Sequence, residues 1–148
     1  VFSQNADWLR EKAVPAAAAA FQANPDVDVV YGHNDPMAEG AYIAAQDAGI
    51  DPANVLFVGI DALPTPDGGI MSVLEGRLGV TFVYPTGGKQ AIDWAHSLLV
   101  DGVNPPLWLV LPFDTVSPDN AQAVCDAFAC PAAAGSGAGA SAPASTAP

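Results

Sequence analysis

Short apolar segments alternate with longer segments of helical periodicity along most of this chain. The apolar segments are rich in β-branched and aromatic residues and are bounded by turn residues, which is the composition of strands. The predicted strands lie at 1–4, 27–31, 55–60, 78–83 and 107–111, and helical segments separate them. This alternation predicts an α/β fold, a doubly wound parallel sheet with right-handed crossovers.

Two of the predicted helices have start and stop signals. For the helix at 36–48, we expect Asp35 to be the N-cap and Pro36 the first helical residue, and Gly49 to end the helix. A later helix follows Thr86, its expected cap. The residues of this later helix that we expect to face the core are Ile92, Ala95, Leu98 and Leu99.

The composition limits the kinds of partner. The 148 residues are 51% hydrophobic, which is enough for one core-bearing domain, and we place it at 1–130. Only four Lys and Arg residues stand against sixteen Asp and Glu residues, for a formal net charge of -12. A nucleic-acid partner would need a basic patch, so none is expected. No apolar run reaches the roughly 20 residues of a spanning helix, so no direct membrane insertion is expected.

The two ends of the chain differ from its middle. Residues 131–148 are uncharged and consist of Ala, Gly, Ser, Pro and Thr. Such a segment buries too little apolar surface to offset the entropy of ordering, so we expect a disordered, low-complexity tail. Val1 falls inside a predicted strand, and we therefore expect the chain to be a fragment or a processed product.

Hydrogen-bonding or aromatic side chains follow successive predicted strands. Trp8 and Arg10 come after the first strand, Asn34 after the second, Asp61 after the third and Tyr84 after the fourth. The carboxyl ends of parallel strands meet at one edge of a sheet, where open α/β folds bind ligands. An aromatic face, a guanidinium, an amide, a carboxylate and a phenol suit a neutral polyhydroxylated molecule, which stacks its C–H face and bonds through its hydroxyls.

Four segments carry a family resemblance. They read Ala-Asp-Trp-Leu-Arg-Glu-Lys-Ala at 6–13, Asn-Pro-Asp-Val-Asp-Val-Val-Tyr-Gly-His-Asn-Asp-Pro-Met-Ala-Glu-Gly-Ala at 24–41, Val-Gly-Ile-Asp-Ala at 58–62 and Gly-Val-Thr-Phe-Val-Tyr-Pro at 79–85. In this order they resemble the C-terminal lobe of periplasmic sugar-binding proteins, of the ribose- and galactose-binding kind found in ABC transporters. The resemblance implies one lobe of a type I periplasmic-binding fold, with the N-terminal lobe missing.

The resemblance also implies roles for the strand-end residues. Trp8 matches the ring-stacking aromatic and Arg10 a hydroxyl-binding arginine, while Asn34 and Asp61 match a paired amide and carboxylate. Tyr84 falls where ribose and galactose binders have an amide, so the sugar is left open. Family members close two lobes on the ligand, and micromolar binding corresponds to about -8.2 kcal/mol. With one wall of the cleft missing, we expect this chain alone to show no measurable sugar affinity.

Each of these residues also has a purely structural interpretation. Trp8 could cover the sheet edge, and Arg10 could be a solvated helix residue paired with a neighbouring carboxylate of Asp7 or Glu11. Asn34 could serve only to form the turn before the helix cap, and Asp61 could cap the next turn.

The sequence carries little indication of a metal site, a cofactor site or a catalytic site. His33 and His96 lie far apart with no second ligand at metal spacing, and no glycine pattern for a nucleotide is present, so no metal and no cofactor are expected. Asp35 and Asp61 could be imagined as a glycosidase pair, but Asp35 is committed to its cap. We therefore expect a binding protein and not an enzyme.

Cys125 and Cys130 lie in one predicted helix. Five residues apart on a continuous helix, their Cα atoms would be roughly 8 Å or more apart, too far for a disulfide. A disulfide would need the helix to end between them, which Pro131 makes possible. The alternative is a pair of inert buried thiols.

The leading functional hypothesis is the substrate-binding component of an ABC sugar transporter. It would bind a small monosaccharide outside the cytoplasm, in the periplasm or on a lipid anchor, and present the sugar to an ABC permease. One alternative is a periplasmic binding protein that feeds a sensor kinase. Another is the effector-binding core of a LacI-type transcription repressor, which shares the fold and would be marked by an upstream helix-turn-helix.

Overall fold

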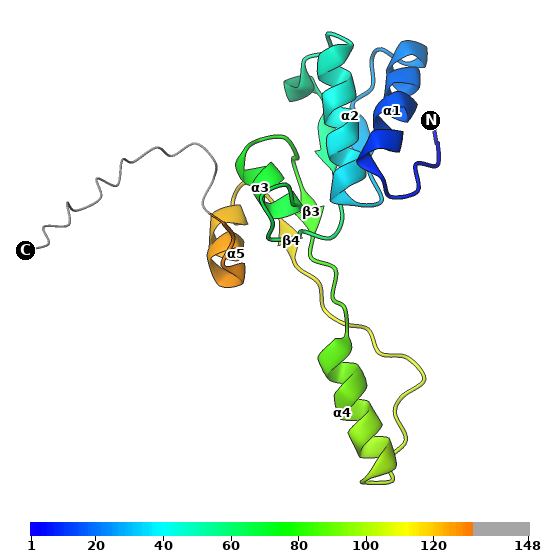
Figure 1. Cartoon of the computed structure of the whole chain (residues 1–148), viewed down its shortest axis with the longest axis vertical. Coiled ribbons are helices and arrows are strands. Elements are labelled where there is room, and N and C mark those ends of the chain that lie inside the picture. The colour runs from blue at the N-terminus through cyan, green and yellow to red at the C-terminus, as the bar shows by residue number, and fades with distance from the viewer. Residues whose placement is uncertain (132–148) are drawn as a thin grey trace, which may run out of the picture.

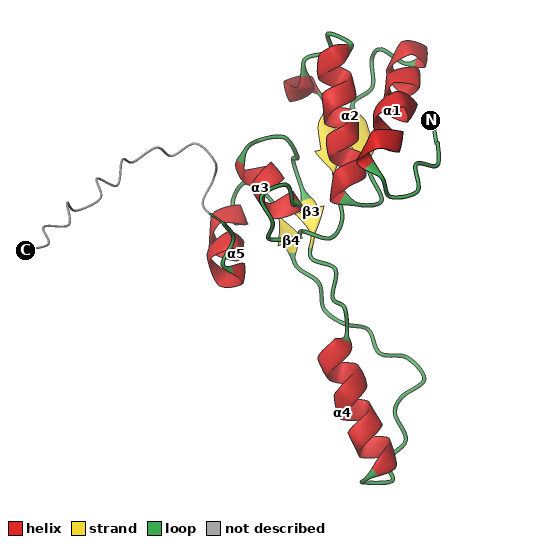
Figure 2. Ribbon diagram, in the orientation of Figure 1, coloured by secondary structure: helices red, strands yellow, loops and turns green. Residues whose placement is uncertain are grey.

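The strands of this chain form a small parallel sheet whose last member is reversed. The computed structural model describes residues 1–131, and Figure 1 shows their arrangement. The strands are β1 (Val29–Tyr31), β2 (Leu56–Val58), β3 (Thr81–Phe82) and β4 (Thr115–Val116). The helices are α1 (Arg10–Ala23), α2 (Asp35–Asp47), the short 3-10 helix η1 (Pro52–Asn54), α3 (Gly69–Leu74), α4 (Gly88–Leu99) and α5 (Ala121–Phe128) (Figure 2).

Hydrogen bonds connect the strands in the order in which they occur. β1 pairs with β2 in parallel, with Val30 opposite Phe57. Parallel bridges from Val58 to Val80 and from Asp61 to Val83 continue the sheet into the β3 segment. The predicted α/β class and the parallel sheet are confirmed. β4, however, runs antiparallel to β3, because the chain returns to the sheet through an extended segment and not through a helix packed on it.

One apolar core holds the sheet and most helices together. Phe57, Ile70 and Leu78 lie at its centre, each at most 2% exposed. Helix α2 supplies a row of small side chains, Ala38, Ala41, Ala44 and Ala45, so that α1 can approach it closely, and α3 packs against α5. Gly49 ends α2 in the left-handed region at φ 72°, as expected.

Two predicted strands are absent from the described residues. Val1–Gln4 and Leu107–Leu111 are extended but unpaired, and nearly all of their side chains are exposed. A strand forms only where a neighbour accepts its backbone hydrogen bonds, and neither segment has one here. Part of the predicted tail, 132–148, lies outside the described residues.

Helix α4 stands apart from the rest of the described chain. Figure 1 shows it projecting from the body, reached by one extended segment before it and one after it. Ile92 is 71% exposed and Leu99 82%, so the expected burial of the apolar face of α4 is wrong for this structure. The expected cap is wrong too, because Gly87, at φ 70°, occupies the N-cap and Thr86 does not bond to the helix. Within 1–131, no helix is long and apolar enough to cross a membrane.

Candidate functional site

The strand-end residues form a row along the carboxyl edge of the sheet. The side chain of Asn34 reaches the carbonyl oxygen of Trp8 at 3.0 Å. The next backbone N–H, that of Asp35, bonds to Ile60 at 2.8 Å, which places Asn34 beside Asp61. The N–H of Asp61 bonds to Phe82 at 3.0 Å, two residues before Tyr84. These connected hydrogen bonds therefore bring four of the predicted residues to one edge.

Asn34 is the N-cap of α2. Its Oδ1 accepts the N–H of Met37 at 3.0 Å while its Nδ2 donates to Trp8, so the expectation that Asp35 is the cap is wrong. An asparagine amide has two donor hydrogens and two acceptor lone pairs. One of each remains after these bonds. Asn34 is thus both a structural link and a side chain that can still bond to a ligand.

Backbone strain concentrates in this row. Five non-glycine residues of the described chain have positive φ, and four of them are Asp7, Trp8, Asp61 and Ala62. Such conformations cost free energy and persist where the surrounding structure holds them, often at functional sites. At φ 59°, the backbone presents the Trp8 side chain to solvent, where it is 65% exposed.

Asp61 combines strain with an unpaired carboxylate. Its φ of 107° is one that L-residues rarely adopt. Within residues 1–131 its side chain makes no hydrogen bond or ion pair, and partial burial raises its pKa above the ordinary value. A strained, partly desolvated carboxylate without a partner in the described chain can accept hydrogen bonds from a bound hydroxyl compound.

Arg10 is held by a buried carboxylate that the sequence analysis missed. Its Nη2 donates to Oε2 of Glu39, and a side-chain oxygen of Glu39 also accepts from Nη2 of Arg77 at 3.1 Å. Ser72 Oγ completes the cluster by bonding to Glu39, whose side chain is only 5% exposed. The alternative pairing of Arg10 with Asp7 or Glu11 is wrong, because within 1–131 Arg10 pairs with Glu39 and Asp67, and Asp7 pairs with Lys12. The spacing of Glu39 on α2 carried no signal for this contact.

Asp35 lies beneath the row, in the core. Its carboxylate accepts the N–H of Ala62 at 2.8 Å and the hydroxyl of Thr81 at 2.6 Å, and so ties α2 to the segment after β2 and to the start of β3. Gly59 and Gly69 make room for it, since a Cβ on either would lie 2.2 or 2.1 Å from a carboxylate oxygen. Burial raises the pKa of Asp35 to about 6, while the bonds from Thr81 and Ala62 lower it in part.

Tyr84 lines an aromatic hollow of about 550 Å³ at the end of the row. Its other walls are Tyr31, His33, Ile60, Phe82, Val83, Pro85 and Phe113. Trp8, Arg10, Asn34 and Asp61 do not line it. His33 is exposed and packs beside Tyr31, with ring centroids 5.0 Å apart. The sequence analysis missed this hollow, although the aromatic residues at two strand ends, Tyr31 and Phe82, could have indicated it.

A larger hollow, about 690 Å³, lies beside β1 and shares Tyr31 and His33 with the first. It lies between the N-terminal segment, α1 and the free edge of β1, and its walls are mainly aliphatic and alanine side chains. It includes Met37 and His33 but none of the five predicted site residues. Within 1–131, no cluster of three or more His, Cys, Asp or Glu side chains has the arrangement of a metal site.

Comparison with known proteins finds sugar-binding proteins and domains. No protein-family model matches the chain. The ribose import binding protein of Escherichia coli K12 is 42% identical over 99 residues, which are 66% of this chain and 32% of that protein. The fructose-binding periplasmic domain of a hybrid two-component system is 35% identical, with a TM-score of 0.77 over 84% of this chain and 41% of that one.

This chain is a homologue of the periplasmic sugar-binding proteins. A galactofuranose-binding protein adds a TM-score of 0.76 at 25% identity, covering 87% of this chain and 44% of that protein. The described residues therefore have the fold of one lobe of a type I periplasmic binding protein, as the resemblance implied. The chain spans about a third or less of the curated relatives and under half of the solved ones. These relatives are named as binding proteins or binding domains.

Proposed function

We propose that this chain supplies one wall of a cleft that binds a small monosaccharide, in a protein that works outside the cytoplasm. The observation that carries the proposal is the juxtaposition of Asn34 and Asp61 at neighbouring strand ends, linked by the 2.8 Å bond from Asp35 to Ile60. An amide with spare bonding capacity and a carboxylate without a partner in 1–131 can together hold a pair of hydroxyls. Trp8 supplies an exposed ring for the C–H face of the sugar.

The five residues divide into contacts and support. Trp8, Asn34 and Asp61 are the proposed contacts from this lobe. Tyr84, whose hollow those three do not line, is proposed to extend the site at the end of the row. Arg10 is proposed as the support, because its Nη2 donates to Glu39. The proposed mechanism is binding followed by closure of a second lobe, with no bond made or broken.

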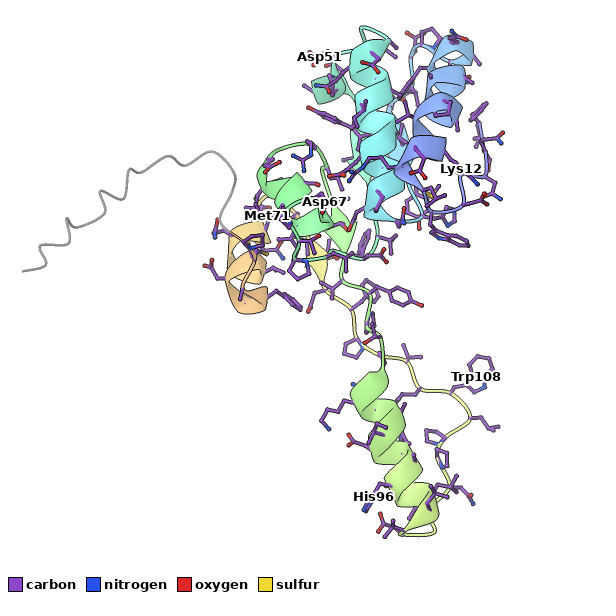
Figure 3. The ribbon with its side chains drawn as sticks, in the orientation of Figure 1. Lys12, Asp51, Asp67, Met71, His96 and Trp108 are labelled. Carbon is purple, nitrogen blue, oxygen red and sulfur yellow. The ribbon has the colours of Figure 1, made fainter. Side chains whose placement is uncertain are left out.

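We propose that the second lobe also covers α4. This helix and the segment after it project from the body and expose many apolar side chains. These are Ile92, Leu98, Leu99, Val100, Val103, Leu107, Trp108, Leu109 and Val110. Figure 3 shows Trp108 on the segment that runs beside α4, pointing away from the helix. The solved relatives are more than twice as long as the part matched here, so a second body of comparable size is available in proteins of this kind.

For the ligand we propose a class of sugar and not an individual sugar. Relatives are named for ribose and D-allose, and similar solved proteins for fructose, galactofuranose, L-arabinofuranose and myo-inositol. All of these ligands except myo-inositol, a cyclic polyol, are pentoses or hexoses, and this range supports a pentose or hexose. The output proposed first is import through an ABC permease, because several relatives are named for import or as ABC transporter components.

A second candidate output is sensing. The similar solved domain from a hybrid two-component system is periplasmic and 35% identical to this chain. Both outputs use the same cleft, so reconstitution separates them. Sugar uptake into vesicles with the cognate permease supports import, and sugar-dependent phosphorylation by a cognate kinase supports sensing.

The test is a thermal-shift screen of pentoses and hexoses on the full-length protein. One or a few sugars should raise the melting temperature, and Asp61→Asn should reduce that shift. A lost charged hydrogen bond is worth about 1.5–3 kcal/mol, or roughly ten- to a hundredfold in affinity. Asp47→Asn, at the exposed end of α2, is the matched control. The absence of a shift with any sugar, or an unchanged shift in Asp61→Asn, would contradict the proposed site.

A further inference from the structure

Helix α5 ends in a turn with a left-handed residue, and this turn brings the two cysteines of the chain together. The N–H of Ala129 bonds to the carbonyl of Asp126 at 3.3 Å, and the N–H of Cys130 bonds to the carbonyl of Cys125 at 3.0 Å. Ala129 is left-handed, at φ 53° and ψ 50°. This pair of nested bonds around a left-handed residue is a Schellman motif, in which the side chains of the two outer residues meet. Here those outer residues are Cys125 and Cys130.

On a continuous helix the two cysteines would be too far apart for a disulfide, and this motif brings them closer. The helix ends between the two cysteines, as a disulfide requires. Both cysteines are free thiols in this structure. Cys125 is 7% exposed in the core, and Cys130 packs against that core. The thiol pair is therefore held in place by the fold and not only by its nearness in sequence.

We propose that Cys125 and Cys130 form a disulfide that locks the carboxyl end of α5. The left-handed conformation is strained for alanine, which has a Cβ. A covalent link between the two outer residues would hold this strained turn closed. The surrounding part of α5 packs against α3, so the lock would also fix the position of that contact.

The chemistry is an exchange with a disulfide oxidant, either a protein dithiol oxidase in its disulfide form or oxidised glutathione. The thiolate of one cysteine attacks an oxidant sulfur and expels one thiolate from it. The second cysteine, after losing its proton, attacks the mixed disulfide and expels the other thiolate. The two cysteines lose two electrons and two protons, and the oxidant is reduced to two thiols.

The local environment predicts how the reaction depends on pH. Burial and the neighbouring Cys125 thiol raise the pKa of Cys130 to about 11. The reactive thiolate is therefore scarce at neutral pH, and oxidation should accelerate in mildly alkaline buffer. An oxidising compartment follows from the extracytoplasmic location proposed above. The geometry of the thiol pair does not depend on that proposal, and neither does the test below.

The test compares disulfide formation in the folded and unfolded chain. The 148-residue chain is equilibrated with reduced and oxidised glutathione, in native buffer and in concentrated urea, then acid-quenched and analysed by mass spectrometry. The intramolecular product is lighter by two hydrogen atoms. We expect its equilibrium constant to be about tenfold or more higher in native buffer, because the fold holds the thiols together. An equal or lower constant in native buffer, or a product that is only intermolecular, would overturn the proposal.

Variants of Ala129 test the motif itself. Ala129→Gly tolerates the left-handed conformation and should keep or raise the native constant, whereas Ala129→Val should lower it severalfold in native buffer only. Ala127→Val, an exposed change in the same helix, is the matched control and should leave the constant unchanged. Equal constants for Ala129→Val and Ala127→Val would show that the turn does not pair the thiols. Sugar binding has no part in these measurements, so their outcome is separate from that of the proposed function.

Discussion

The side-chain amide of Asn34 donates a hydrogen bond to the main-chain carbonyl of Trp8, 3.0 Å away, and thereby joins the start of α2 to the strained turn before α1. The same side chain caps α2 through the N–H of Met37. One residue thus holds both the helix and the turn that exposes the Trp8 ring. The shape of the proposed sugar mouth depends on this link.

Substitutions at Asn34 should separate these two contacts. Asn34→Asp keeps the acceptor for Met37 but loses the donor to Trp8, and we expect it to lower the free energy of unfolding by about 1 kcal/mol. Asn34→Ala loses both contacts and should cost about 2 kcal/mol. Urea unfolding measures both values, with exposed Asn54→Ala as the control. Equal losses for Asn34→Asp and Asn34→Ala would mean that the cap contributes nothing.

Asp61→Gly should stabilise the chain and abolish sugar binding. Glycine adopts the φ of 107° at position 61 without the strain of a Cβ, so the free energy of unfolding should rise by about 1 kcal/mol. The lost carboxylate should remove the sugar-induced thermal shift of the full-length protein. Thermal melts with and without sugar measure both effects. A destabilised Asp61→Gly would show that the conformation at this position is not strained.

The stability of the chain should fall as pH rises between about 4 and 6. The folded-state pKa of Asp35 is about 6, above its unfolded value of 3.8, so in this range the folded chain binds more protons than the unfolded one. The shift corresponds to a loss of about 2–3 kcal/mol, complete above the folded-state pKa. Urea unfolding at several pH values measures it. Asp35→Asn should flatten this dependence and Asp47→Asn should not; a slope unchanged by Asp35→Asn would contradict the assignment.

Leu99→Asp should have little effect on the stability of the 148-residue chain and should destabilise the full-length protein. Leu99 is 82% exposed here, so in the 148-residue chain the change should alter the free energy of unfolding by less than about 0.5 kcal/mol. In the full-length protein a charge would enter the proposed contact with the second lobe, at a cost of about 2–4 kcal/mol. His96→Asn, a polar change on the same helix, is the control. A small effect in both proteins would contradict the proposal that the second lobe covers α4.

Local sequence patterns were sufficient for the α/β class and for the row of strand-end residues. The apolar, β-branched composition of 27–31 and 55–60 predicted the central strands, and parallel strands bring Asn34 and Asp61 to the same edge in any such sheet. Gly49 ended a helix in both prediction and structure because its left-handed conformation is a local property.

What depends on partners distant in sequence was decided by the tertiary structure. Only the packing of α2 against its neighbours brings Glu39 between Arg10 and Arg77, and buries Asp35 against Thr81, leaving the cap to Asn34. For the same reason, apolar periodicity could show that α4 has a face to bury but not whether a covering surface is present. Secondary structure follows largely from local backbone preferences, whereas burial and ion pairing need a second surface, which a local pattern does not specify.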